Sequence, residues 1–123
     1  MEKKKILIVE DDPDMLDMLK TAFEGAGFSV LSFKSGGEAL AHVQSEKPDL
    51  VMLDIILIGM DGMTVLKEIR EHGIRVPVII LTNLSADEKI MEGVLRDEPS
   101  YYMVKSDSPI EDIIAKVKTT LGI

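Results

Sequence analysis

The sequence contains no cysteine and no tryptophan, and aromatic residues make up only 4% of its 123 residues. Without cysteine the chain has no disulfide, no thiolate metal ligand and no thiol nucleophile. This composition is compatible with a reducing compartment, so we expect a cytoplasmic location.

Long hydrophobic segments are missing as well. No uncharged apolar stretch reaches the roughly 18 residues that a membrane helix requires, and Met1–Lys5 leads into a strand-like run without a cleavage-site pattern. We therefore expect neither membrane insertion nor export. The run of Lys3, Lys4 and Lys5 is interpreted as a solvated lead-in to the first strand.

Basic residues are few compared with acidic ones: 14 against 22, for a net charge of −8. Such a balance repels a phosphate backbone, so direct nucleic-acid binding is not expected. The length, together with a hydrophobic fraction of 46%, suits one continuous core. We expect residues 1–123 to form a single domain.

Five short runs are apolar along most of their length, as in strands of a sheet covered on both faces. They are Ile6–Val9, Phe28–Phe33, Leu50–Leu53, Val78–Leu81 and Tyr101–Val104. A segment with helical spacing follows each run, and such alternation requires right-handed crossovers and a parallel sheet. The sequence predicts an α/β fold: a flavodoxin-like, doubly wound (βα)5 three-layer sandwich with a five-stranded parallel sheet in the order 2-1-3-4-5.

Four local signals mark helix starts. Ser35, Ser85 and Ser108 each stand three residues before a glutamate, as in a capping box. Asp12-Pro13 supplies a cap followed by proline at the first helical position.

Polar residues follow four of the apolar runs directly. They are Glu10 and Asp11, Asp54, Thr82, and Lys105. Each alone has an ordinary structural explanation, but parallel strands end at one edge of a sheet, and ligands bind there near the reversal of strand order, between strands 1 and 3. We therefore expect three carboxylates, a hydroxyl and an ammonium to converge. Asp12, just beyond, is better explained as a helix cap.

Three neighbouring carboxylates repel one another unless a cation neutralises them. Oxygen ligands without histidine or cysteine favour Mg²⁺ or Mn²⁺ over zinc. With its charge offset, Asp54 can attack phosphorus and form an acyl phosphate. The Lys105 ammonium and the Thr82 hydroxyl are placed to stabilise the negative charge of the transferred group.

Five short motifs occur in order, each at a predicted strand end or in the loop after it. They are Ile-Leu-Ile-Val-Glu-Asp-Asp at 6–12, Val-Met-Leu-Asp at 51–54, Gly-Met-Asp-Gly at 59–62, Leu-Thr at 81–82 and Tyr-Met-Val-Lys at 102–105. From Lys4 to Leu121 the chain resembles the receiver domain of two-component response regulators.

The resemblance implies that Asp54 accepts a phosphoryl group from a histidine kinase or a histidine phosphotransfer protein. Mg²⁺ would be held by Asp11, Asp54 and the backbone carbonyl of Ile56, with Glu10 acting mainly through water.

It also implies that Thr82 hydrogen-bonds the phosphoryl group, that Lys105 pairs with it, and that Tyr102 changes rotamer as Thr82 moves. The surface of the helix expected near 85–96, the last strand and the last helix would then signal to an output protein, an effector domain or a second copy in a phosphorylation-dependent homodimer. The chain would be an enzyme only in the sense that it catalyses its own phosphorylation and dephosphorylation.

The chain departs from the family pattern in the loops around the site. Ile58 and Ser106 stand where proline is usual, the latter normally after a cis bond; Asn83 replaces a small residue; and Glu98-Pro99 replaces Gly-Ala. These changes bear on loop rigidity, on the Lys105–Ser106 isomer and on access for the phosphodonor.

Two further positions, Ile56 and Leu84, influence acyl-phosphate hydrolysis in the family, and both are apolar here. Because apolar side chains disfavour an ordered attacking water, they predict a longer-lived phosphorylated state.

A receiver-like adaptor that binds a partner without phosphorylation stays open, since the departures cluster around the switch loops. A Mg²⁺-dependent phosphohydrolase with an aspartate nucleophile would need a second aspartate where Ile56 stands. A flavodoxin is excluded because Glu10, Asp11, Asp12 and Asp14 would repel the flavin phosphate.

Overall fold

The computed structural model describes residues 3–55, 57, 61–83 and 101–123. In chain order the elements are β1 (Lys5–Val9), α1 (Pro13–Gly25), β2 (Ser29–Phe33), α2 (Gly36–Glu46), β3 (Leu50–Leu53), α3 (Gly62–Glu71), β4 (Val78–Thr82), β5 (Tyr101–Val104), the 3₁₀ turn η1 (Lys105–Asp107) and α5 (Ile110–Leu121). All five predicted strands are present, with ends within one residue of the prediction.

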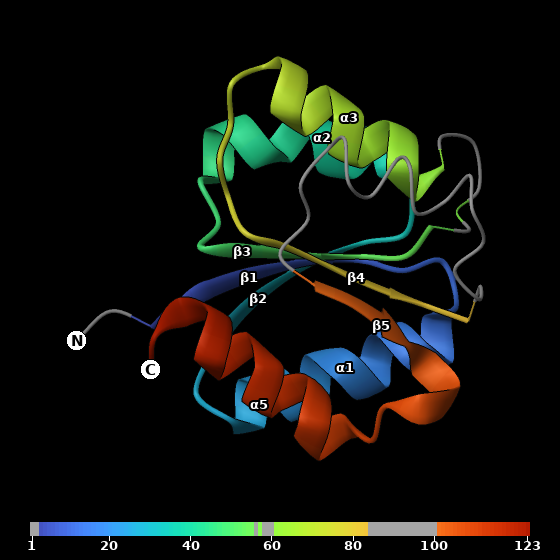
Figure 1. Ribbon diagram of the computed structural model, residues 1–123, viewed down its shortest axis with the longest axis vertical. Coiled ribbons are helices and arrows are strands. Elements are labelled where there is room, and N and C mark those ends of the chain that lie inside the picture. Colours follow the sequence, from blue (N-terminus) through green and yellow to red (C-terminus); the bar gives the residue numbers. More distant parts are fainter. Residues whose placement is uncertain (1–2, 56, 58–60, 84–100) are drawn as a thin grey trace.

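The strands form one parallel sheet in the order β2-β1-β3-β4-β5. Helices α1 and α5 lie on one face of the sheet, and α2 and α3 lie on the other (Figure 1). The predicted flavodoxin-like, doubly wound three-layer sandwich is therefore confirmed.

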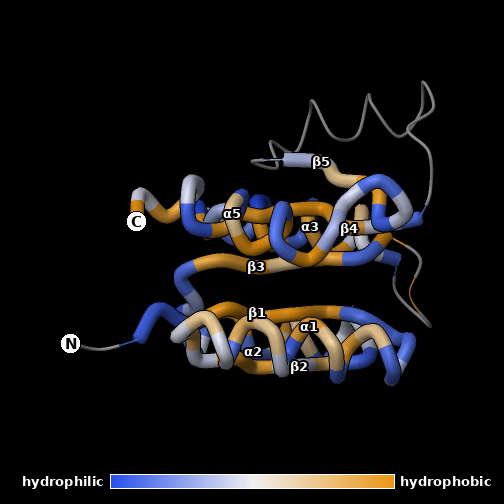
Figure 2. The backbone as a smooth tube through the Cα atoms, turned by 90° about the horizontal axis from the view of Figure 1, so that it is seen from below, coloured by the Kyte–Doolittle hydropathy of each residue, from blue (hydrophilic) through white to orange (hydrophobic). Residues whose placement is uncertain are grey.

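The core has two halves because successive residues of a strand point to opposite faces. Ile8 and Met52 belong to the half that packs against α1 and α5. Leu7 and Val51 belong to the half against α2 and α3. Strands β3 and β4 are buried along their whole length, whereas the edge strands β2 and β5 are largely half-buried. The apolar character of β1 and β3 is visible along the tube in Figure 2.

Two predicted helix caps are confirmed. The Asp12 carboxylate accepts a hydrogen bond from the Asp14 backbone N–H at 3.1 Å, and Pro13 is the first residue of α1. The Ser35 hydroxyl accepts from the Glu38 N–H at 3.3 Å at the start of α2.

The prediction for Ser108 was wrong. Pro109 occupies the cap position of α5, and no side chain caps this helix. The Ser108 hydroxyl instead donates to the Val104 carbonyl at 2.8 Å. A serine hydroxyl can satisfy a nearby backbone carbonyl as well as an N–H group, and here the turn after β5 uses it in that way.

Several predictions lie outside the described residues: the Ser85 cap, the helix expected near 85–96, and the Glu98-Pro99 departure. No peptide bond within the described ranges is cis, so the Lys105–Ser106 bond is trans. None of the helices described has the length and apolar character of a membrane span.

Candidate functional site

The candidate site lies where β1, β3, β4 and β5 end, at one edge of the sheet. The register pairs Val9 of β1 with Leu53 of β3, so the residues that follow, Glu10 and Asp54, come out side by side. The Asp54 N–H continues this ladder by donating to the Val9 carbonyl at 3.1 Å. The backbone of the sheet therefore fixes the positions of both carboxylates.

Three carboxylates meet at this edge. One oxygen from each of Glu10, Asp11 and Asp54 lies within 4.8 Å of the other two. Glu10 is 2% exposed and Asp54 is 6% exposed, whereas Asp11 is half-buried. The structure thus brings these three side chains together, as predicted from the sequence.

Lys105 reaches this cluster from the end of β5. Its ammonium donates to Glu10 Oε2 at 2.5 Å and to Asp54 Oδ2 at 2.9 Å, and the lysine side chain is 12% exposed. One buried ammonium thus bridges two of the three carboxylates and offsets one of their negative charges. The direct contact with Glu10 was not expected from the sequence, which assigned Lys105 to the phosphoryl group.

Burial raises the pKa of Glu10 above its ordinary value of 4.5, and hydrogen bonds from Lys105 and from the Asp12 N–H offset part of that rise. Burial lowers the pKa of Lys105. The hydrogen bonds to Glu10 and Asp54, together with the negative charges of these two carboxylates, outweigh this effect and raise the lysine pKa above 10.5. Lys105 therefore stays charged across the physiological range.

Thr82 and Tyr102 lie on the same face of the sheet. Thr82 ends β4 and is fully buried. Ile80 of β4 pairs with Tyr102 of β5, and both belong to the half of the core against α2 and α3. Thr82 lies two residues beyond Ile80 on the same strand, so its side chain points to the same face as that of Tyr102. Asn83, the next residue, is exposed.

The start of α3 packs against the backbone of Asp54. The Gly62 N–H donates to the Ile55 carbonyl at 2.8 Å, and a Cβ on Gly62 would lie 2.0 Å from the Asp54 carbonyl oxygen. Asp61 caps the helix by accepting from the Thr64 N–H at 2.9 Å. No role for Asp61 or Gly62 was predicted from the sequence, although aspartate followed by glycine ahead of a helical stretch is a signal for such a cap.

Two of the residues named from the resemblance, Ile56 and Leu84, lie outside the described residues, as does Ile58. Asp12 is exposed and caps α1, so its assignment to the cap rather than to the carboxylate cluster holds.

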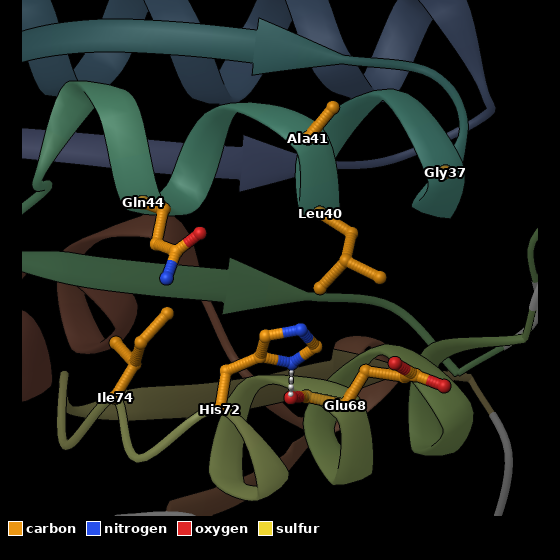
Figure 3. A pocket seen from close by; sticks show the side chains of 7 residues that line it. All are labelled: Gly37, Leu40, Ala41, Gln44, Glu68, His72 and Ile74. Atoms are coloured by element: carbon orange, nitrogen blue, oxygen red, sulfur yellow. Dashed lines mark hydrogen bonds between the residues drawn. The ribbon is translucent and has the colours of Figure 1, made fainter.

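A cavity of about 400 Å³ opens elsewhere, between α2 and α3, and contains no residue of the cluster. In Figure 3, Leu40 and Gln44 of α2 face His72 and Ile74 at the end of α3. His72 Nδ1 donates to the Glu68 carbonyl at 2.8 Å, and both His72 and His42 are exposed.

The parallel sheet in the order 2-1-3-4-5, with acidic residues after strands 1 and 3 and a lysine after strand 5, is the arrangement that the sequence resemblance predicts. Residues 6–118 match the family of response regulator receiver domains. The chain therefore belongs to that family.

Curated relatives agree. The chain is 37% identical over 120 residues to the alkaline phosphatase synthesis transcriptional regulatory protein PhoP of Bacillus subtilis, covering 96% of this chain and 48% of the relative. It is 42% identical over 107 residues to the transcriptional regulatory protein QseB of Escherichia coli O157:H7, covering 87% of this chain and 48% of that protein. The chain thus spans about half the length of these relatives.

Solved structures show the same fold. The BeF3-activated N-terminal receiver domain of RstA from Klebsiella pneumoniae superposes with a TM-score of 0.87 at 32% identity, covering 96% of this chain and 98% of the other. A CheY-like receiver domain protein from Methanospirillum hungatei gives a TM-score of 0.88 at 30% identity, covering 98% and 95% of the two chains.

Proposed function

We propose that this chain is a phosphorylation-activated signalling switch that accepts a phosphoryl group on Asp54. The observation that carries the proposal is the Asp54 carboxylate beside Glu10 and Asp11, with the Lys105 ammonium 2.9 Å away. The phosphodonor would be a phosphohistidine of a histidine kinase or of a phosphotransfer protein. A P–O bond to Asp54 forms as the donor P–N bond breaks, and the electron pair of that bond returns to the imidazole.

The carboxylate cluster suits a hard divalent cation, Mg²⁺ or Mn²⁺. The oxygens of the cluster lie within 4.8 Å of one another, so one small ion could contact more than one of the carboxylates. Asp11 and Asp54 would hold the ion together with the Ile56 carbonyl, and Glu10 would act through water. When bound, the cation supplies positive charge that offsets the carboxylates and the entering phosphoryl oxygens.

The remaining groups would stabilise and report the phosphorylated state. Lys105 holds a fixed positive charge at Asp54, so it can pair with a phosphoryl oxygen there. Thr82 would donate its hydroxyl to the phosphoryl group, and Tyr102 would change rotamer as Thr82 moves.

The output surface would include β5 and α5 together with the segment near 85–96. Tyr101 on this surface is 38% exposed, and the Lys116 ammonium lies 4.2 Å from the centre of its ring. An output protein, an effector domain or a second copy in a phosphorylation-dependent dimer would bind there. Gel filtration with and without beryllofluoride, which takes the place of the phosphoryl group, tests whether the dimer depends on phosphorylation.

We further propose that residues 1–123 form one domain, that it works in the cytoplasm where its kinase donors act, and that it does not itself bind nucleic acid. Apolar residues at Ile56 and Leu84 would slow hydrolysis of the acyl phosphate. A polar residue introduced at either position is expected to shorten the lifetime of the phosphorylated state.

The test is to incubate the protein with Mg²⁺ and acetyl phosphate and to measure its intact mass. Wild type should gain one phosphoryl group, and Asp54→Asn should gain none. Asp12→Asn is the matched control, because asparagine caps a helix as well as aspartate does and Asp12 lies outside the cluster. Failure of wild type to gain a phosphoryl group, or equal labelling of Asp54→Asn, would favour the receiver-like adaptor that binds its partner without phosphorylation.

A further inference from the structure

A second feature lies at the opposite end of the sheet from the carboxylate cluster. A cavity of about 350 Å³ is lined by three lysines, Lys3, Lys4 and Lys118, and by Ala26, Phe28 and Ile123. These residues come from the segment before β1, the α1–β2 turn and the end of α5. Figure 1 shows both termini at this end, away from the points of the strand arrows.

The backbone around the cavity is held by hydrogen bonds. The Ser29 N–H donates to the Lys4 carbonyl at 2.9 Å, which ties Lys4 to β2. The Ile123 N–H donates to the Lys118 carbonyl at 2.9 Å, with Gly122 in the left-handed conformation at φ 74°. This Schellman arrangement folds Ile123 back over the end of α5.

The floor of the cavity is apolar. Phe28 is 3% exposed and lies against Phe23, with ring centres 5.7 Å apart. Ile123, which also lines the cavity, is 61% exposed.

All the charged side chains that line the cavity are basic. No acidic residue lines the cavity, and none of its three lysines has an ion-pair partner among the described residues. The carboxyl-terminal ends of α1 and α5 point here, but each helix end contributes only about half a negative charge. Two such ends offset about one of the three ammonium groups, and a free carboxylate at Ile123 would offset one more, so a positive charge remains at the cavity although the chain carries a net charge of −8.

We propose that this lysine-rimmed cavity binds an acidic peptide segment of a partner protein. An apolar side chain of the segment occupies the cavity over Phe28 and Ile123, and flanking carboxylates pair with the lysines. A nucleic acid fits less well, because a phosphate backbone leaves the apolar floor unfilled and is repelled by the rest of the chain. Since the cavity is remote from Asp54, binding does not depend on phosphorylation.

The test is a titration of the isotope-labelled full chain with the blocked peptide Glu-Asp-Leu-Asp-Glu, followed by amide chemical shifts. Signals of Gly27, Phe28 and Gly122 should move. Exposed ion pairs contribute little individually, so replacing all three is expected to weaken binding by about tenfold. The variant is Lys3→Glu/Lys4→Glu/Lys118→Glu.

Lys20→Glu/Lys34→Glu/Lys67→Glu is the matched control, since it changes the net charge equally at exposed lysines elsewhere. It should bind the peptide nearly as wild type does, and Ile123→Ser should bind more weakly. The proposal is overturned if the two triple variants lose binding equally, if the three signals do not move, or if a short DNA duplex moves them as strongly as the peptide.

Discussion

At the scale of single residues, Lys105 is the countercharge of a buried acidic site. Lys105→Met keeps a long side chain but removes the ammonium that bridges Glu10 and Asp54. Breaking a buried ion pair leaves uncompensated charge, so the free energy of unfolding should fall by about 3 kcal/mol in metal-free buffer. Adding Mg²⁺ should increase the free energy of unfolding more in this variant than in wild type, because the metal ion replaces the missing positive charge of the ammonium.

Urea unfolding with EDTA and with Mg²⁺ measures both effects. Lys67→Met is the control, since its side chain is 54% exposed and its pair with Glu71 at 3.9 Å is a surface one. A Lys105→Met variant as stable as the control in EDTA would contradict the bridging role.

Glu10 predicts a specific pH dependence. Its pKa in the folded protein lies above 4.5, mainly because of burial, so between the two values the folded state binds more protons than the unfolded state. Glu10 therefore favours folding as the pH falls toward 4.5, and this contribution is lost as the pH rises through the raised pKa. In EDTA, the stability of wild type relative to Glu10→Gln should decrease from acid to neutral pH.

Glu24→Gln, at an exposed position of α1, is the matched control for the substitution itself. A constant difference between wild type and Glu10→Gln at all pH values would show that Glu10 does not titrate with folding.

Which residues form the site could be predicted from the sequence, but which carboxylates Lys105 contacts could not. Glu10, Asp11, Asp54 and Lys105 each follow an apolar strand, and a parallel sheet brings such residues together. Which carboxylate Lys105 contacts depends on the reach of a long side chain from β5 and on local burial. Neither quantity is encoded in the spacing of motifs.

At the scale of elements, the start of α3 sets the position of the Asp54 backbone. Gly62→Ala would place a methyl group 2.0 Å from the Asp54 carbonyl oxygen, so the helix or the strand end must shift. We expect a loss of about 1–3 kcal/mol in the free energy of unfolding, and slower phosphorylation because Asp54 is displaced.

Gly37→Ala in α2 is the matched control, because no heavy atom lies within 4 Å of the added methyl group. Alanine is the better helix former by about 1 kcal/mol, so this variant should be at least as stable as wild type. Thermal unfolding and acetyl phosphate labelling compare the two; equal stability of both variants would rule out the close approach.

Element boundaries show where local patterns stop being informative. The central strands could be predicted because they are continuously apolar and buried on both faces. Strand β2 begins at Ser29 rather than Phe28, because the Phe28 N–H donates to the Phe23 carbonyl at the end of α1. The prediction that Ser108 caps α5 was wrong because a serine hydroxyl has several possible backbone partners, and the sequence does not say which one lies nearest.

At the scale of the whole molecule, the two proposed sites lie at opposite ends of the sheet. Carboxylates gather at the carboxyl ends of the strands, and three lysines without an ion-pair partner among the described residues line the cavity at the other end. If a cation binds at the first site and an acidic segment at the second, as proposed, metal binding and peptide docking should be independent.

Metal binding should also raise the stability of the entire fold, since a ligand that binds only the folded state shifts the unfolding equilibrium. At a free Mg²⁺ concentration ten times the Kd, the free energy of unfolding should increase by about 1.4 kcal/mol. Asp11→Asn should abolish this increase because it removes a carboxylate of the cluster. Asp14→Asn, an exposed acidic residue only three positions away, should retain it. Urea unfolding of the three proteins at matched ionic strength makes the comparison, and an equal Mg²⁺ effect in Asp11→Asn would mean that the ion acts through the general charge of −8 rather than through the cluster.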